Sequence, residues 1–336
     1  MQTVILKDDS KGIASAAEML SAGGVVAIPT ETVYGLAASA YDDNAIAKVF
    51  KAKGRPQDNP LIVHICDMDM LGEVAVDLPD EAFALAEAFW PGPLTMVVKK
   101  SDKIAQSVSR GLDTVAVRMP DHPVAGQIIR RSGLPLAAPS ANISGSPSPT
   151  SAAHVIADLD GRIDGVVVSG DSRVGVESTV ITLATKPPRL LRPGLITAEE
   201  LKAYLPDLVI DSAVLAQPED GQKVASPGMK YKHYSPKTEV ILVEADAAAF
   251  ADFVNGQRES AAICFDEDAE KITLPTLCYG SGEDEESQAH SLFSCLRQAD
   301  GLGVKRVYVH APKKSGVGLA VYNRLIRAAA FKVIKL

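Results

Sequence analysis

The chain has 336 residues, of which 46% are hydrophobic and 23% are charged, and its formal net charge at pH 7 is -8. This balance is that of an ordinary globular protein with a sizeable core, and the length favours two domains over one. The negative charge weighs against a protein whose main task is to grip a nucleic-acid backbone, although local basic patches are compatible with it.

From the sequence we expect neither a membrane span nor a secretion signal. No apolar run reaches the ~18 residues that a membrane-spanning helix needs, and the N-terminal residues lack the pattern of a signal peptide. The four cysteines lie far apart, without the short spacing of a zinc site or a redox dithiol. We therefore expect a soluble cytoplasmic protein with no membrane contact and no protein-bound metal.

Short apolar strands alternate with helical segments between residues 24 and 205, which is typical of an α/β fold. Segment 43–53 illustrates the helical pattern, because Asp42 or Asp43 can cap its start and Gly54 can end it. The expected strands are 24–28, 61–65, 94–98, 114–118 and 165–169. The expected helices are 43–53, 80–89, 124–131, 152–159 and 197–205.

A segment without periodicity follows, and we interpret residues 206–236 as a linker. It ends in the run Ser-Pro-Gly-Met-Lys-Tyr-Lys-His-Tyr-Ser-Pro, in which proline and glycine argue against a regular element. Linkers rarely need aromatic residues, so Tyr231, His233 and Tyr234 leave two interpretations open. The segment is either a tether packed on the surface or a lid whose side chains reach an active site.

The alternation resumes after the linker and predicts a small Rossmann-like domain over residues 237–336. Gly316 and Gly318 open its last helix, but Val321 stands where a dinucleotide-binding fingerprint has its third glycine, so we do not expect dinucleotide binding. The acidic stretches 266–268 and 283–286 are interpreted as solvated loops. The expected strands are 238–243, 261–265, 306–310 and 331–334, and the expected helices are 246–255, 286–298 and 318–330.

Common catalytic signatures, such as a Walker-type phosphate loop, a Gly-x-Ser-x-Gly elbow or a His-Glu-x-x-His metal motif, are absent from the sequence. Other segments place polar groups after expected strands, where the ligands of α/β sheets gather. The first is Pro-Thr-Glu-Thr-Val-Tyr-Gly-Leu over residues 29–36, which could equally be a capped turn. The second places Lys53 and Arg55 at a helix C-terminus, where a fixed guanidinium suits phosphate but the helix dipole alone also favours cations.

Three further segments complete the candidate site. Arg118 ends an otherwise apolar strand, and a buried guanidinium there needs an anion, which is either a substrate carboxylate or a structural acid. Residues 137–148 form a run of small and polar residues, either a flexible surface loop or a place where a ligand approaches the backbone. Residues 177–180, together with Arg192, are either a strand-edge turn with a surface cation or part of the same site.

Together these segments resemble the YrdC-like domain of the two-domain threonylcarbamoyl-AMP synthase family, over about residues 11–197. The motifs that carry the resemblance are the run at 29–36, Lys-x-Arg at Lys53 and Arg55, and Ser-x-Asn at Ser140 and Asn142. The linker run and a C-terminal Gly-Leu-Ala-Val-Tyr-Asn-Arg-Leu-Ile-Arg run resemble the longer, two-domain branch. The resemblance implies a YrdC-like domain with a twisted mixed open sheet at 1–205, a linker and lid at 206–236, and a smaller Rossmann-like α/β domain at 237–336.

The resemblance also implies an activity. Family members are nucleotidyltransferases that condense L-threonine, bicarbonate or CO2, and ATP to L-threonylcarbamoyladenylate and pyrophosphate. The product passes to a separate transferase that modifies an adenosine beside the tRNA anticodon. Such a reaction depends on positioning and charge neutralisation, so it needs no nucleophile triad. Mg²⁺ is expected on the triphosphate, held mostly by phosphates and water.

The resemblance assigns roles to particular residues. Lys53 and Arg55 form the expected catalytic pair, Arg118 suits a carboxylate, and Ala138 can offer only its backbone. The expected ATP-binding residues are Lys53, Arg55, Asn59, Thr114, Ser140, Asn142, Ser148, Arg192 and Tyr234. The expected threonine-binding residues are Thr32, His64, Arg118, Ala138 and Ser178.

Two rival interpretations remain open, and the first belongs to a different class of protein. A double-stranded RNA-binding module without adenylate-forming activity is suggested by the cations Lys48, Lys51, Lys53 and Arg55, and weak RNA binding would also be compatible with an enzyme. A carbamoyl-adenylate enzyme acting on carbamoyl phosphate, as in hydrogenase maturation, would be expected to carry zinc-finger-like cysteines, which this chain does not show.

Overall fold

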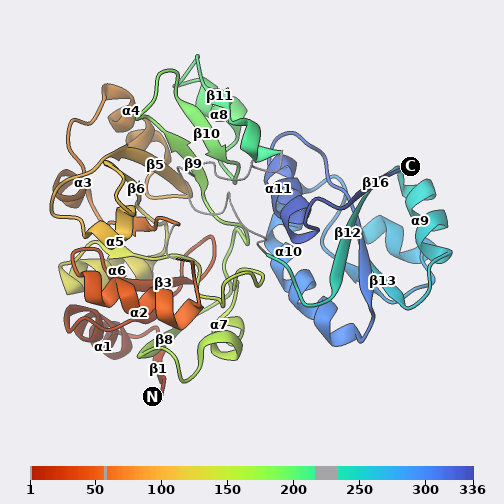
Figure 1. The fold of residues 1–336 in the computed structure, drawn as a ribbon, viewed down its shortest axis with the longest axis horizontal. Helices are drawn as coiled ribbons and strands as arrows, with labels where there is room; N and C mark the ends of the chain where they lie inside the picture. The colour runs from red at the N-terminus through yellow and green to blue at the C-terminus, as the bar shows by residue number, and fades with distance from the viewer. Residues whose placement is uncertain (1, 57–58, 216–233) are drawn as a thin grey trace.

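The computed structural model describes residues 2–56, 59–215 and 234–336. They form two parts, which we call the N-terminal unit (2–215) and the C-terminal unit (234–336), each built on its own sheet (Figure 1). In the described residues no helix is long and apolar enough to cross a membrane. The predicted class, an α/β fold with a large mixed sheet and a smaller second sheet, is confirmed.

The sheet of the N-terminal unit has 11 strands in the order β1-β8-β2-β3-β7-β4-β6-β5-β9-β10-β11. It is mixed, because pairs such as β4·β6 are parallel whereas β2·β3 and β5·β6 are antiparallel. Its strands are β1 (Val4–Lys7), β2 (Val26–Ile28), β3 (Gly35–Ser39), β4 (Ile62–His64), β5 (Leu94–Lys99), β6 (Thr114–Arg118), β7 (Leu136–Ala137), β8 (Gly165–Val168), β9 (Thr179–Thr182), β10 (Arg189–Arg192) and β11 (Val209–Ile210).

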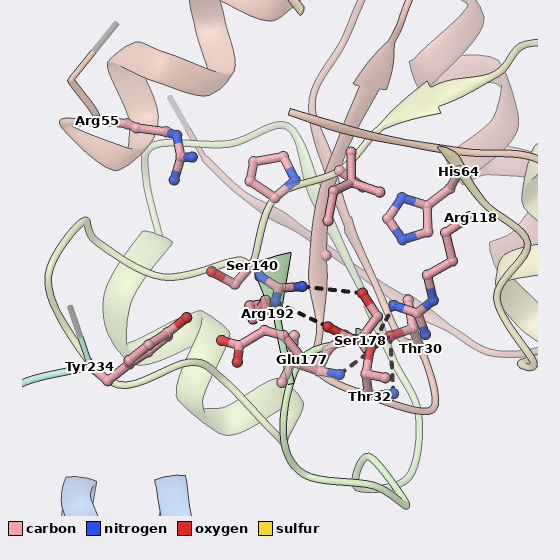
Figure 2. Close-up of a pocket in the computed structure, with 15 residues that line it drawn as sticks. Thr30, Thr32, Arg55, His64, Arg118, Ser140, Glu177, Ser178, Arg192 and Tyr234 are labelled. Atoms are coloured by element: carbon pink, nitrogen blue, oxygen red, sulfur yellow. Dashed lines mark hydrogen bonds between the residues drawn. The ribbon is translucent and has the colours of Figure 1, made fainter. Parts of the chain in front are cut away.

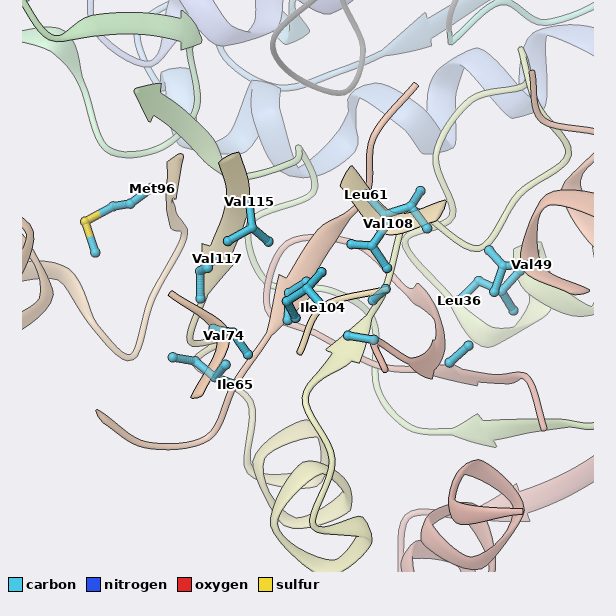
Figure 3. Close-up of a cluster of buried hydrophobic side chains, with 14 of the residues drawn as sticks. Leu36, Val49, Leu61, Ile65, Val74, Met96, Ile104, Val108, Val115 and Val117 are labelled. Carbon is cyan, nitrogen blue, oxygen red and sulfur yellow. The ribbon is translucent and has the colours of Figure 1, made fainter. Parts of the chain in front are cut away.

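Helices cover both faces of this sheet. Successive residues in and just before β2 alternate between these faces. Val26 and Ile28 pack with α1 and α6, whereas Val25 and Ala27 join the larger core on the other face. Figure 3 shows part of that larger core, including Leu36, Val49 and Val117. The helices are α1 (Ser10–Ser21), α2 (Asp43–Lys53), α3 (Met68–Val74), α4 (Asp80–Phe89), α5 (Gln106–Ser109), α6 (Pro123–Ser132), α7 (Ala152–Leu159) and α8 (Ala198–Lys202), followed by a 3-10 turn, η1 (Ser212–Val214).

The C-terminal unit has a sheet of five parallel strands in the order β14-β13-β15-β12-β16. Helices α10 and α11 pack on one face, and α9 packs on the other. The elements are β12 (Glu239–Glu244), α9 (Ala247–Asn255), β13 (Ser260–Cys264), η2 (Asp266–Lys271), β14 (Thr276–Cys278), α10 (Glu285–Ala299), η3 (Asp300–Leu302), β15 (Arg306–His310), α11 (Gly318–Ala328) and β16 (Val333–Lys335).

The two units share a hydrophobic cluster. Val33, Val174 and Val176 of the N-terminal unit belong to the same buried cluster as the facing residues of α10 and α11. In Figure 1 these two helices lie between the C-terminal sheet and the N-terminal unit. The contact brings the C-terminal unit against the 29–36 loop, which was the first candidate segment in the sequence.

Two features differ from the sequence predictions. The acidic stretches are not merely solvated loops, because Asp268 is buried in η2 beside His310 and Glu285 begins α10. Residues 209–210, within the stretch interpreted as linker, form β11, which pairs with β10. Tyr231 and His233 lie outside the described residues, so the lid remains a prediction.

Candidate active site

The loop after β2 forms one wall of a pocket in the N-terminal unit. Thr30 Oγ1 donates to the Val33 carbonyl at 2.6 Å and lies 2.9 Å from Thr32 Oγ1, so the turn is closed by its own hydroxyls. Gly35 follows at the start of β3, and a Cβ there would come within 3.2 Å of the Ala138 Cβ. The bare backbone lets β3 lie close to the segment that carries Ala138.

His64 and Arg118 end the neighbouring parallel strands β4 and β6 at paired positions, as expected for ligand-binding groups of an α/β sheet. The buried Arg118 donates from Nη1 to Thr32 Oγ1 at 2.8 Å and from Nε to the Gly92 carbonyl at 3.2 Å. Its Nη2 lies 2.6 Å from Glu31 Oε1 as an ion pair, but no hydrogen bond of ordinary geometry joins the two. The anionic partner left open by the sequence is therefore Glu31 in this structure.

His64 is uncharged at neutral pH. Burial, with the nearby positive charge of Arg118, lowers the pKa of His64 to about 3. Its Nδ1 has no hydrogen-bond partner among the described residues. A neutral imidazole in this position can accept a hydrogen bond from a bound molecule or donate one to it.

Ser178 and Arg192 lie in the middle of the pocket (Figure 2). Arg192, at the end of β10, donates from Nε to the Ser178 carbonyl at 3.0 Å and from Nη2 to Ser178 Oγ at 3.1 Å. The same Ser178 hydroxyl lies 2.8 Å from Thr95 Oγ1. Burial disfavours the charged guanidinium and lowers the pKa of Arg192. An anion bound beside Arg192 would offset this cost and would therefore be favoured.

Lys53 organises the loop that carries Ser140 and Asn142. Its Nζ, which is buried, donates to the Ser140 carbonyl at 2.5 Å and to the Asn142 carbonyl at 2.6 Å. Burial lowers the pKa of Lys53 well below its usual value, and the nearby Arg55 adds to this effect. Lys53 thus fixes the backbone of a pocket wall, where Ser140 Oγ donates to Asn142 Oδ1 at 2.6 Å.

Arg55 and Tyr234 line the pocket on the side away from Arg118 (Figure 2). Arg55 follows α2, whose C-terminus is capped by Gly54 in the left-handed conformation (φ 58°). Tyr234, next to the stretch that is not described, is buried and packs on Phe293 with ring centroids 5.2 Å apart. Burial raises the pKa of Tyr234, so its phenol stays protonated.

The pocket encloses about 620 Å³ of space, its open mouth included. Nine of the predicted site residues line it: Thr32, Arg55, His64, Arg118, Ala138, Ser140, Ser178, Arg192 and Tyr234. Five others do not line it: Lys53, Asn59, Thr114, Asn142 and Ser148. Lys53 and Asn142 support the wall, whereas Thr114 is at the opposite end of β6 from Arg118, about 13 Å away at ~3.3 Å per residue.

Two acidic residues in the site were given no role by the sequence. Glu177 lines the pocket, and Glu31 pairs with Arg118. Both belong to segments that the sequence singled out, but a carboxylate in a polar run gives no sign of whether it will be buried. The four cations behind the RNA-binding rival do not form one exposed patch, because Lys53 is 1% exposed.

Matches to known families cover most of the chain. Residues 18–194 match the family described as "Telomere recombination", and residues 196–330 match the family described as "Threonylcarbamoyl-AMP synthase, C-terminal domain". A relative from Pyrococcus abyssi named threonylcarbamoyl-AMP synthase is 45% identical and aligns over 95% of this chain and 94% of its own length. A relative of the same name from Bacillus subtilis is 43% identical over 98% of this chain and 96% of its own.

A solved structure agrees with these matches. The crystal structure described as P. abyssi Sua5 complexed with L-threonine superposes with a TM-score of 0.91 at 42% identity, over 100% of both chains. Fold and pocket together define an α/β enzyme with cationic and hydroxyl groups converging beyond the strand ends. The chain belongs to the threonylcarbamoyl-AMP synthase family, which confirms the family and the enzyme class predicted from the sequence.

Proposed function

We propose that this enzyme condenses L-threonine, bicarbonate or CO2, and ATP to L-threonylcarbamoyladenylate and pyrophosphate. The observation that carries the proposal is the division of the pocket into two cationic ends. Arg118, Thr32 and His64 lie at one end, and Arg55, Ser140 and Tyr234 lie at the other (Figure 2). We call these the threonine end and the nucleotide end.

The threonine end suits a small hydroxy amino acid. The Arg118 guanidinium is held by Thr32, by the Gly92 carbonyl and by its ion pair with Glu31, and a substrate carboxylate could share this cation. Hydroxyl groups and a neutral His64 surround it, and a site that hydrogen-bonds a substrate hydroxyl rejects analogues that lack the hydroxyl. The threonine complex named for the P. abyssi relative supports this assignment.

The nucleotide end suits a triphosphate. Arg55 offers a planar set of donors, and Lys53 holds the backbone of the Ser140–Asn142 loop beside it. We assign Asn59, Thr114, Asn142 and Ser148 to the nucleotide as well, although they lie behind or away from the lining in this structure. The predicted lid, which ends at Tyr234, would complete this end of the pocket.

The chemistry needs positioning rather than a covalent intermediate. The threonine amine adds to CO2 and loses a proton to give a carbamate. A carbamate oxygen then attacks the α-phosphorus of ATP, and the bond to the bridging oxygen breaks so that pyrophosphate leaves with its electron pair. Arg192, between the two ends, and Arg55 stabilise the charge that develops on the phosphoryl oxygens.

Mg²⁺ would enter with the triphosphate and offset its charge. Among the described lining residues the carboxylate is Glu177, and both of its oxygens already accept hydrogen bonds, from Arg324 and from Ser148. Phosphate and water oxygens would therefore supply most of the metal ligands. The product would pass to a transferase that modifies tRNA in the cytoplasm, with any contact to RNA being weak.

A direct test is to incubate the protein with ATP, Mg²⁺ and bicarbonate and add one amino acid at a time. We expect pyrophosphate and a new adenylate with L-threonine, and at least tenfold less with valine, which replaces the hydroxyl by a methyl group. Serine, which keeps the hydroxyl, is the matched comparison. Equal turnover with valine and threonine, or ATP consumption that ignores the amino acid, would refute the proposal.

A further inference from the structure

An arginine of the C-terminal unit holds a residue that lines the pocket. Arg324 of α11 has a side chain that is 0% exposed, and it pairs with Glu177 of the N-terminal unit. Its Nε donates to Glu177 Oε2 at 3.0 Å, its Nη2 to the Glu177 carbonyl at 3.1 Å, and its Nη1 to the Pro193 carbonyl at 2.5 Å. One guanidinium therefore fixes both the side chain and the backbone of a residue that lines the pocket.

Glu177 transmits this constraint to Ser148. The second carboxylate oxygen, Oε1, accepts a hydrogen bond from Ser148 Oγ, and Ser148 is fully buried. Burial alone would raise the pKa of Glu177, but Arg324, Arg192 and the Ser148 hydroxyl together lower it, so the carboxylate is charged and each oxygen has a donor. The three residues form a chain from α11 to the Ser148 loop.

A second arginine of the C-terminal unit holds the same loop. Arg297 of α10 forms a two-pronged pair with Asp158, at 3.0 and 2.9 Å, and its Nη2 also donates to the Pro147 carbonyl at 2.5 Å. The loop that ends at Ser148 is thus fastened to the C-terminal unit at two adjacent residues. A loop rich in glycine, serine and proline would otherwise be mobile, and a displacement of about 1 Å can cost an enzyme on the order of 100-fold in rate.

We infer that Arg324 is a positioning residue of the adenylate-forming site and that, through Glu177, it holds the Ser148 loop and the Glu177 backbone in place beside the nucleotide. The C-terminal unit then completes the nucleotide end of the pocket rather than only accompanying it. This inference rests on the proposed function for the identity of the nucleotide. Arg324 touches no reacting atom and acts through the residues that it holds, chiefly Glu177.

The test measures ATP affinity by calorimetry and the KM for each substrate in the full-length protein. In Arg324→Gln we expect the Kd and KM for ATP to rise at least tenfold, whereas the KM for threonine changes less than threefold. Arg324→Lys, which keeps the charge, should recover part of the loss. His290→Ala is the matched control, because His290 Nδ1 makes a 3.0 Å contact with the Arg173 carbonyl across the same interface without reaching Glu177 or Ser148.

A double-substitution cycle separates positioning from a general loss of structure. If Arg324 acts through the Ser148 hydroxyl, Arg324→Gln should weaken ATP binding much less in a Ser148→Ala background than in the wild type. The inference would be overturned if the two substitutions weaken ATP binding by factors that simply multiply. It would also be overturned if a folded Arg324→Gln protein binds ATP as tightly as the wild type. Circular dichroism and thermal unfolding establish that each variant is folded.

If Arg324→Gln fails to fold, Arg297→Gln takes its place. The Arg297 side chain is 14% exposed, so its substitution should disturb folding less than that of the fully buried Arg324. We expect at least a threefold rise in the Kd for ATP, and no change would overturn the shared role of the two arginines. A wild-type protein that binds ATP but makes no adenylate would refute the proposed function instead. The ATP affinities of the variants would still decide the inference.

Discussion

The two sheets of this protein end in different ways. In the N-terminal unit, β4 and β6 end in His64 and Arg118 at the wall of an open pocket. In the C-terminal unit, β15 ends in His310, whose ring nitrogens lie 2.6 Å from Asp268 Oδ2 and 3.0 Å from the Ala245 carbonyl. The ring also stacks on Phe250 at 4.5 Å, so the protein's own side chains fill this edge.

The N-terminus of α11 is also filled by a side chain of the protein itself. In Rossmann-like folds the N–H groups at such a helix start often bind a ligand phosphate. Here the Gly318 N–H donates to Glu285 Oε2 at 2.8 Å, so a carboxylate of the same chain occupies the position. An α/β pattern therefore identifies an edge where a ligand could bind, and the side chains at that edge decide whether one does.

The largest effect should come from the open edge. Arg118→Gln removes the cation of the threonine end and leaves Glu31 buried without its partner. Truncating one member of a buried charge pair costs ~2–5 kcal/mol, so we expect kcat/KM for threonine to fall by about 100-fold or more. Steady-state kinetics with threonine varied at saturating ATP would measure the loss, and a fall of less than threefold would remove Arg118 from the site.

A substitution at the filled edge of the C-terminal sheet should lower stability without changing activity. Asp268→Ala leaves buried His310 Nδ1 without its partner, which should lower the free energy of unfolding by about 1–3 kcal/mol. Urea unfolding measures this loss, and adenylate formation by the folded variant should match the wild type. A large rise in either KM with unchanged stability would mean that the C-terminal edge binds a substrate.

The pH dependence of stability should report the buried, neutral His64. The pKa of His64 falls to about 3 in the folded protein, from about 6.5 in the unfolded chain. Below pH 6.5 the unfolded chain therefore takes up a proton that the folded protein refuses, and stability falls as the pH drops toward 3. At pH 5 this contribution is about 2 kcal/mol, and His64→Gln should remove it. Identical pH slopes for the variant and the wild type would contradict a neutral His64.

The smallest of these effects concerns the nucleotide end. Arg55→Ala should slow pyrophosphate release at least tenfold, which corresponds to ~1.4 kcal/mol of transition-state stabilisation. Lys51→Ala is the control, because Lys51 is exposed on the last turn of the same helix. Unchanged turnover in Arg55→Ala would remove its role, and an equal loss in both variants would favour a diffuse basic surface over a defined site.

Much of the fold could be predicted from local signals. Helices α2, α4 and α7 and strand β6 have the bounds predicted from caps, periodicity and apolar runs. Strand β3 was missed because Gly-Leu-Ala-Ala-Ser is buried throughout and lacks the polar alternation that identifies a half-exposed strand.

The candidate site was predictable only in part. Polar residues after apolar strands pointed to His64 and Arg118, and the structure brings them side by side. Their pairing depends on strand register, and the contact between Glu177 and Arg324 joins residues 147 positions apart. Such long-range neighbours leave no local pattern in a single sequence, which is why this contact of α11 could not be foreseen.

Calorimetry in the presence of both ligands tests the two-ended pocket most directly. Threonine would be titrated into wild-type protein saturated with Mg²⁺ and an ATP analogue that cannot be cleaved between the α- and β-phosphates. We predict one threonine bound per chain, with the heat lost in Arg118→Gln and the analogue still bound there. The two-ended pocket would be contradicted if threonine still binds to Arg118→Gln. It would also be contradicted if the ATP analogue abolishes threonine binding to the wild type.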